Sequence, residues 1–297
     1  MKGGYSVVIA TCDRDEPLAR VLEDWSAQTA PPEKVVVTGA DAPGRNASAG
    51  GGDEANVTRL VSPVRSAARQ RNLGAEVVET EWIVFCDDDV RFAPDLAAVV
   101  LEFLAAHPEA VAVSPRMRGA SHPRPGRWLR RYYGLQAGFP DGTYGGRLFG
   151  AGITCYPCWD IQPAPVEANW LPSTMLWMKA AAFRRHRFPD FEGYSFGEDA
   201  HLTHRVWRDA EPAGRKLYFL GAPEFDHLSI QSGVKADRFR LGRMVVRNQK
   251  RIAREAMGKG AWEVFWKSFV HRMFVTAALI KGRRSGWVGE MIGLWSA

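Results

Sequence analysis

The sequence predicts an α/β fold in which a mixed, mostly parallel sheet is flanked by helices and followed by a helical carboxyl-terminal extension. Three observations predict it. Short apolar runs alternate with amphipathic helix patterns from residue 5 to residue 114. The apolar run Trp82–Cys86 ends directly in three consecutive acids, Asp87–Asp89. The residues after 236 combine helical spacing with many basic and aromatic side chains.

The amino-terminal elements follow from hydrophobic periodicity and turn residues. Strands are expected at residues 5–10, 34–38, 81–86 and 110–114. A helix carrying Leu18, Val21, Leu22 and Trp25 has Asp15 as its expected N-cap. A second helix is expected to begin near Pro63 and to carry Arg65, Arg69, Arg71 and Asn72, and a third to follow Pro94. Residues 40–53 are rich in Gly, Ala, Asp and Ser, which predicts a loop.

The second half of the chain is less regular. Residues 115–170 have poor periodicity and many arginines, so they form either a solvated basic face or a flap over an anionic substrate. A helix is expected from Phe196 through Trp207, and a late strand at residues 216–220. We therefore expect a catalytic domain at residues 1–235, with halves at about 1–114 and 115–235, and a helical extension at 236–297.

Composition limits the class of protein. The chain has 297 residues, 46% of them hydrophobic, and a net charge of +6, which suits an anionic partner without identifying it. No stretch reaches the roughly 18 apolar residues of a spanning helix, and no signal peptide is expected. Four cysteines suggest a reducing compartment. Cys155 and Cys158 form a lone C-x-x-C pair, and we interpret them as ordinary thiols because no second pair accompanies them.

The three acids at Asp87–Asp89 carry the strongest chemical signal. Unpaired carboxylates are not tolerated in a strand core, so the strand must end there. In an open α/β sheet, the carboxyl ends of the strands form the edge where ligands bind. Crowded carboxylates suit a divalent cation and a phosphorylated substrate, although a solvated acidic turn is the simpler alternative.

Four other groups of residues are expected to meet this edge. Thr11, Asp13 and Arg14 follow the first strand, and Arg71 and Asn72 precede the triple acid. Glu198 and Asp199 stand among aromatic residues, where a carboxylate has a raised proton affinity and can serve as a general base; they also suit the start of a helix. His227 follows the late strand and can complete a metal shell.

In this order and spacing, the motifs resemble glycosyltransferase family 2, whose members are inverting nucleotide-sugar enzymes of the GT-A fold. The resemblance covers about residues 4–230. It is carried by Val8–Arg14, Arg71-Asn72-x-Gly74, Phe85–Asp89 with Pro94-Asp95, Gly197–Asp199 and His227.

The resemblance implies a role for each motif. Asp89, with His227, would bind Mg²⁺ or Mn²⁺, while Asp87 would face the nucleotide ribose or the metal and Asp88 would lie on the nucleotide side. Asp199, with Glu198 beside it, would be the catalytic base. The remaining nucleotide contacts would come from Thr11, Asp13, Arg14, Arg71 and Asn72, and from Asp41 near the base. The function implied is hexosyl or deoxyhexosyl transfer from a nucleoside-diphosphate sugar, in bacterial-type cell-surface glycan or glycolipid synthesis.

Two alternatives stay open at this stage. A sugar-phosphate nucleotidyltransferase also uses acids on an α/β sheet, but the loop at residues 11–14 has no glycine. A non-catalytic nucleotide-sugar-binding protein would keep the site without turnover. The acceptor is expected to be a glycan or a lipid-linked molecule, and no nucleic-acid motif is present. We expect a cytoplasmic protein whose basic, aromatic carboxyl-terminal helices either contact the inner face of the membrane or pack on the catalytic domain or a second subunit.

Overall fold

The sheet is the centre of the molecule. The computed structural model describes residues 4–40, 56–137, 144–191, 196–228, 237–282 and 287–297. Within these ranges, one sheet has nine strands in the order β3-β2-β1-β4-β10-β6-β11-β5, with β9 beside β11. The strands are β1 (Tyr5–Thr11), β2 (Lys34–Ala40), β3 (Val57–Ser62), β4 (Trp82–Asp87), β5 (Val90–Phe92), β6 (Ala110–Met117), β9 (Val166–Ala168), β10 (Met175–Lys179) and β11 (Lys216–His227).

Strand directions confirm the predicted sheet. Strands β3, β2, β1 and β4 are parallel to one another, and β6 is parallel to β11. Strand β10 is antiparallel to both of its neighbours, β4 and β6, so the sheet is mixed and mostly parallel. The carboxyl ends of β1 and β4 lie side by side, because Ala10 pairs with Asp87.

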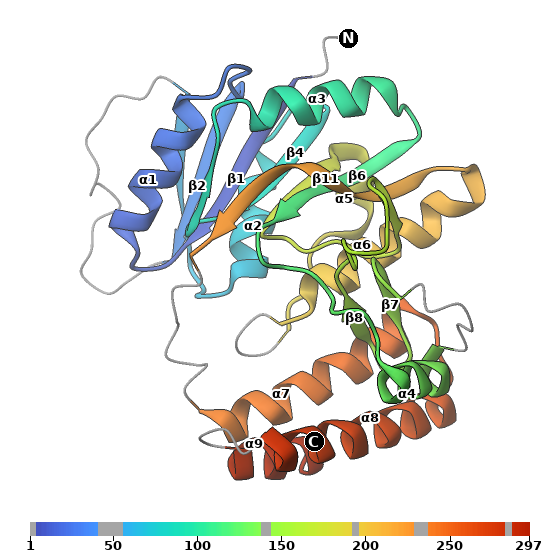
Figure 1. Ribbon diagram of the computed structural model, residues 1–297. Coiled ribbons are helices and arrows are strands. Elements are labelled where there is room, and N and C mark those ends of the chain that lie inside the picture. The colour runs from blue at the N-terminus through green and yellow to red at the C-terminus, as the bar shows by residue number, and fades with distance from the viewer. Residues whose placement is uncertain (1–3, 41–55, 138–143, 192–195, 229–236, 283–286) are drawn as a thin grey trace.

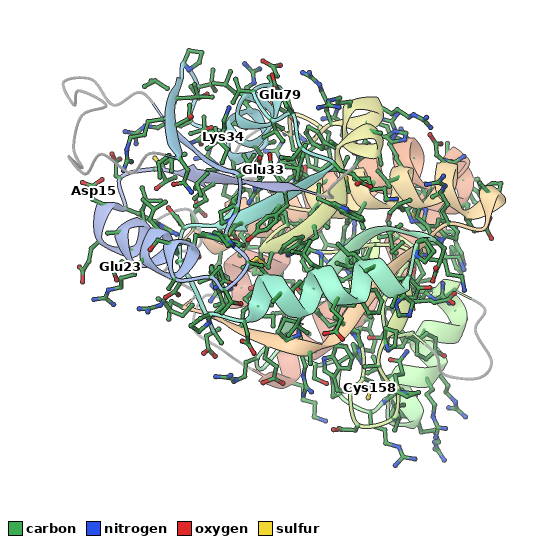
Figure 2. All side chains as sticks on the ribbon, turned by 90° about the horizontal axis from the view of Figure 1, so that it is seen from above. Asp15, Glu23, Glu33, Lys34, Glu79 and Cys158 are labelled. Carbon is green, nitrogen blue, oxygen red and sulfur yellow. The ribbon has the colours of Figure 1, made fainter. Side chains whose placement is uncertain are left out.

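Helices cover both faces of the sheet (Figure 1). On one face, α1 (Asp15–Ser26) and α3 (Leu96–Ala106) pack on side chains such as Val7 and Ile9. On the other, α2 (Ala67–Glu76), α5 (Ala180–His186) and α6 (Glu198–Ala210) pack on Val8 and its neighbours. The alternation of Val7, Val8 and Ile9 between two cores is what a strand covered on both faces requires. On α1, Asp15 and Glu23 are exposed on the outer side (Figure 2).

The starts of two predicted helices were wrong in detail. Helix α2 begins at Ala67, not near Pro63, because the Ser66 hydroxyl accepts the Arg69 N–H and caps the helix there. Arg65 therefore precedes the helix. Arg14, not Asp15, occupies the N-cap position of α1, and Asp15 is the first helical residue. The predicted loop at residues 40–53 lies almost wholly outside the described residues.

Residues 115–170 are more regular than their sequence indicates. They contain α4 (Arg127–Ala137), the hairpin of β7 (Arg147–Phe149) and β8 (Ile153–Cys155), and β9. A small separate core holds this region together, and its members are Tyr132, Tyr133, Tyr144, Phe149, Ile153 and Cys155. Cys155 and Cys158 are both buried free thiols, and burial raises the pKa of Cys155 to about 11.

The carboxyl-terminal residues form a helical layer on one side of the molecule (Figure 1). After the short turn Glu211–Ala213 and β11, the elements are α7 (Arg238–Arg251), a π-helical continuation (Ile252–Ala256), α8 (Ala261–Gly282) and α9 (Trp287–Trp295). Helices α7 and α9 approach closely, since a Cβ on Gly293 would lie 2.1 Å from the Phe239 carbonyl oxygen. Among the described residues, no helix combines the length and apolar character needed to cross a membrane.

Candidate active site

A cleft of about 1140 Å³ opens at the carboxyl ends of β1 and β4. Its lining residues come from the strand ends and loops at this edge of the sheet, from the start of α6 and from α7 in the carboxyl-terminal layer. From the residues chosen on sequence grounds, the cleft brings together Thr11, Asp13, Arg14, Arg71, Asp87, Asp88, Asp89, Glu198, Asp199 and His227. This volume slightly exceeds the roughly 300–1,000 Å³ of typical small-molecule sites, so the cleft is large enough for an extended ligand.

Asp88 joins the triple acid to the loop after β1. The Thr11 hydroxyl donates to its carboxylate at 2.7 Å, and Arg14 Nη1 donates to it at 3.0 Å. Burial raises the pKa of Asp88, while Thr11 and Arg14 oppose that rise by stabilising the charged form. Arg14 Nη1 also donates to the Asp89 carboxylate at 3.2 Å, so Asp88 and Asp89 together fix the loop after β1 against the end of β4.

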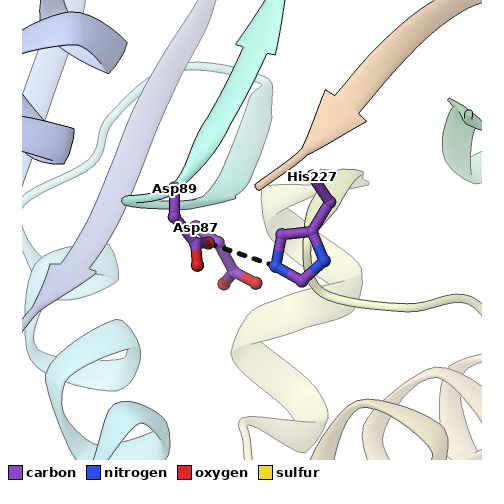
Figure 3. A group of neighbouring side chains, drawn as sticks. All are labelled: Asp87, Asp89 and His227. Carbon is purple, nitrogen blue, oxygen red and sulfur yellow. Dashed lines mark ion pairs between the residues drawn. The ribbon is translucent and has the colours of Figure 1, made fainter. Parts of the chain in front are cut away.

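Asp87, Asp89 and His227 form a compact group of possible metal ligands (Figure 3). One ligand atom from each residue lies within 4.8 Å of the other two, and His227 Nε2 is 3.1 Å from Asp89 Oδ1. His227 reaches the group because β11 pairs with β5, where His227 lies opposite Val90. Two carboxylates and an imidazole suit Mn²⁺ or Mg²⁺, so the residues present fit a divalent cation.

Arg71 connects the acids of β4 to those of α6. Its guanidinium donates to Asp87 at 2.7 Å and to Glu198 at 3.1 Å. The Arg71 side chain is only 6% exposed, so these two carboxylates are its main partners rather than solvent. A buried, doubly paired arginine holds its neighbours in place.

Glu198 and Asp199 begin helix α6. Gly197 precedes them with φ of +85°, a conformation that glycine adopts without strain, and a Cβ there would lie 2.7 Å from Ile252 Cδ1. The Asp199 carboxylate accepts backbone N–H groups of Ser173 at 3.3 Å and Ala200 at 2.7 Å. These bonds orient Asp199 within the cleft.

Both carboxyl groups hold protons more tightly than usual. Burial, with the nearby charge of Asp199, raises the pKa of Glu198 to about 7 although Arg71 lowers it. Burial also raises the pKa of Asp199. A carboxylate of raised proton affinity in a cleft is suited to accept a proton from a substrate near neutral pH.

Two residues selected from the sequence are not placed among the cleft residues. The Asn72 side chain is bonded at both ends to the backbone of Phe188, accepting its N–H at 3.0 Å and donating to its carbonyl at 2.9 Å. It thus anchors α2 to the segment after α5. Asp41 lies outside the described residues. Asp13 lines the cleft and pairs with Arg65 at 3.1 Å.

Sequence reasoning missed other cleft residues. The Gln70 amide donates to the carbonyls of Thr11 and Thr38, at 2.6 and 2.7 Å, and so ties together the ends of β1 and β2. Its position next to Arg71 in the sequence could have identified Gln70 as a candidate site residue. Arg240 lines the cleft from α7. The segment contains several basic residues, and its sequence does not indicate which of them faces the cleft.

The family model described as glycosyl transferase family 2 matches residues 6–161, more than half of the chain. The protein therefore belongs to glycosyl transferase family 2, and it is a glycosyltransferase. The match ends before Glu198, Asp199 and His227, so their placement beside the triple acid comes from the structure alone. A comparison with curated proteins found no significant match.

Solved structures show the same fold at low sequence identity. S. aureus TarS 1-349 is 15% identical, with a TM-score of 0.51, and the alignment covers 96% of this chain and 74% of that one. The same TarS segment in complex with UDP gives 13% identity at the same coverage. GalNAc-T7 with UDP, GalNAc and Mn²⁺ is 13% identical, with a TM-score of 0.56, over 92% of this chain and 57% of that one. The protein thus has the GT-A fold that its sequence resembles.

Proposed function

We propose that this glycosyltransferase is metal-dependent and inverting, and that it moves a hexose or deoxyhexose from a nucleoside-diphosphate sugar to an acceptor hydroxyl. The observation that carries the proposal is the shared cleft: Asp87, Asp89 and His227 at the end of the sheet, with Asp199 at the start of α6. Support for the donor class comes from family membership and from the UDP present in two structures of the same fold.

The proposed roles divide between the two sides of the cleft. Asp87, Asp89 and His227 would hold Mn²⁺ or Mg²⁺, which supplies positive charge to the departing diphosphate when it is bound. Thr11, Asp13 and Arg14 lie where a nucleoside would meet the loop after β1. Arg71 keeps Asp87 and Glu198 in position, and we assign it to that task instead of direct diphosphate contact.

Asp199 is the proposed base. Its carboxylate, oriented by the Ser173 and Ala200 N–H groups, accepts the proton of the acceptor hydroxyl as the oxygen attacks the anomeric carbon. The bond from that carbon to the diphosphate breaks on the opposite face, so configuration at the carbon is inverted. Glu198 does not take this role, because its carboxylate is directed to Arg71.

A thermal-shift screen tests the donor class. The full-length protein is heated with UDP-, GDP- and dTDP-sugars, each with Mn²⁺, Mg²⁺ or EDTA. We expect one nucleotide family to raise the melting temperature in the presence of metal but not of EDTA, because binding to the folded state alone stabilises it. No shift with any donor would contradict the proposal. Release of nucleoside diphosphate on adding acceptor then separates a transferase from a binding protein, and release of pyrophosphate from a sugar phosphate and nucleoside triphosphate would indicate a nucleotidyltransferase.

A further inference from the structure

Helix α8 presents an apolar stripe to solvent. Its exposed large side chains are Trp262 (76% exposed), Phe265 (59%), Trp266 (51%), Phe269 (39%), Met273 (53%) and Ile280 (47%). Their spacing of three, four and seven residues places all of them on one side of the helix. The opposite side packs inward through Val264 and Ser268, which are buried. A helix on an ordinary protein surface has polar residues where α8 has this stripe.

Neighbouring helices extend the apolar surface. Phe269 of α8 contacts Trp295 of α9, with ring centroids 5.9 Å apart, and α9 also exposes Val288 and Ile292. On α4, which packs beside α8 through the stacked rings of Tyr132 and Phe274, Trp128 and Leu135 are exposed. We call these exposed side chains of α4, α8 and α9 the apolar face. Exposed apolar side chains gathered on neighbouring helices, several of them tryptophans, typically mark an interaction site.

The charge of the chain is concentrated in the same region. Residues 236–297 contain 13 Lys and Arg but only four Asp and Glu, whereas residues 1–235 contain 26 and 29. The extension is therefore strongly positive and the remainder slightly negative. On α4, Arg127, Arg130 and Arg131 are also exposed. This charge complements an anionic lipid surface. In a symmetric dimer formed through this face, like charges of the two copies would be brought together, which is unfavourable.

The helical layer also connects the apolar face with the cleft. Arg240 and Gln249 of α7 line the cleft, as does Ile252 just after it. Helix α7 packs closely against α9, where a Cβ on Gly242 would lie 2.5 Å from the Glu290 carbonyl oxygen. The cleft and the apolar face thus border the same helical layer.

We propose that the apolar face lies in the interface of an anionic bilayer and that the acceptor hydroxyl belongs to a lipid-linked molecule in that bilayer. The second clause rests on the proposed transferase function; the first does not. Aromatic side chains of α8 would enter the boundary between headgroups and acyl chains, with the basic residues of the layer contacting lipid phosphates. The acceptor would then reach the cleft beside α7.

Vesicle flotation tests the docking. The full-length protein, the double variant Trp266→Glu with Phe269→Glu, and a control, Val77→Glu with Ile161→Glu, are floated with vesicles of phosphatidylcholine containing phosphatidylglycerol. The control changes charge equally at exposed apolar side chains outside the apolar face. We expect the wild type and the control to float, and the α8 variant to lose about tenfold in bound fraction. Pure phosphatidylcholine or high salt should weaken wild-type flotation.

Two results would overturn the docking proposal. One is a wild type that stays with the soluble fraction. The other is an α8 variant that floats as well as the wild type. A wild type that sediments as a dimer and does not float, with a monomeric α8 variant, would assign the face to a second copy. Because flotation needs no donor or turnover, it can succeed even if the donor screen fails, so the two proposals are tested separately. The α8 variant should also transfer sugar to a lipid-linked acceptor in vesicles more slowly than the wild type does. Its melting temperature should equal that of the wild type, which shows that the loss does not come from unfolding.

Discussion

Replacing Arg71 with methionine tests whether this residue holds the two sides of the cleft together. Methionine keeps much of the side-chain volume and removes the charge. Two carboxylates then lose their partner: Asp87, whose side chain is 25% exposed, and Glu198, which is 7% exposed. The folded state must leave these charges poorly compensated or take up a proton.

The magnitude follows from burial and from the proton affinity of Glu198. Removing one partner of a buried ion pair costs about 3–5 kcal/mol. The partial exposure of Asp87 places Arg71→Met at the low end, at about 3 kcal/mol at pH 8. The pKa of Glu198 is raised from 4.5 to about 7 on folding, so this group contributes stability below pH 4.5 that is lost as pH rises through 7. Loss of Arg71 raises that pKa further, so protonation of Glu198 at pH 6 offsets part of the destabilisation of the variant.

Urea unfolding followed by tryptophan fluorescence measures the effect. We expect the destabilisation to be smaller at pH 6 than at pH 8 by about 1 kcal/mol, which is most of the roughly 1.4 kcal/mol that corresponds to a tenfold rise in the proton affinity of Glu198. Arg69→Met is the matched control, because Arg69 pairs with Asp190 at the surface, with both side chains about half exposed. It should destabilise the protein far less than Arg71→Met, because an exposed ion pair contributes little to stability. Equal costs for the two variants, or a cost for Arg71→Met that does not change with pH, would refute the assignment.

Two further predictions concern the packing and titration of the site. Gly74→Ala should destabilise the protein by about 1–3 kcal/mol in the same urea assay, because the new Cβ would lie 2.6 Å from Val8 Cγ1 and 2.8 Å from Thr38 Oγ1. The control is Gly134→Ala, where the new Cβ would meet open space. Unchanged stability in Gly74→Ala would contradict the close packing of α2 on the sheet. Arg71→Met should shift the acid limb of the pH–rate profile to higher pH, because loss of a nearby positive charge raises the pKa of Asp199; a shift to lower pH would contradict this coupling.

Local sequence patterns were sufficient for the main frame of the fold. Buried strands such as β1 and β4 are short apolar runs whose ends are marked by polar residues, and α1 has clear helical spacing. The position of the triple acid followed from one physical rule, that a buried strand cannot continue through three carboxylates. Parallel strands then bring the loop after β1 to the same edge.

Features that depend on distant contacts could not be predicted in this way. The late strand was expected at residues 216–220, which is only the first part of β11. The strand then passes through an irregularity and continues to His227 by pairing with β5 and β6. The role of Arg71 depends on Glu198, 127 residues later in the chain. The Asn72 side chain bonds to the backbone of Phe188, 116 residues later in the chain, and no local pattern reveals this contact.

Asp89 is assigned to metal-dependent donor binding and Asp199 to proton transfer, and one paired measurement tests both assignments. With the donor found by the screen, calorimetric titration and turnover are measured for the wild type, Asp89→Asn and Asp199→Asn. We predict that Asp89→Asn loses metal-dependent donor binding. Asp199→Asn should bind donor like the wild type but fall in turnover by at least about 100-fold. Full turnover in Asp199→Asn, or metal-dependent donor binding of wild-type affinity in Asp89→Asn, would contradict the assignment.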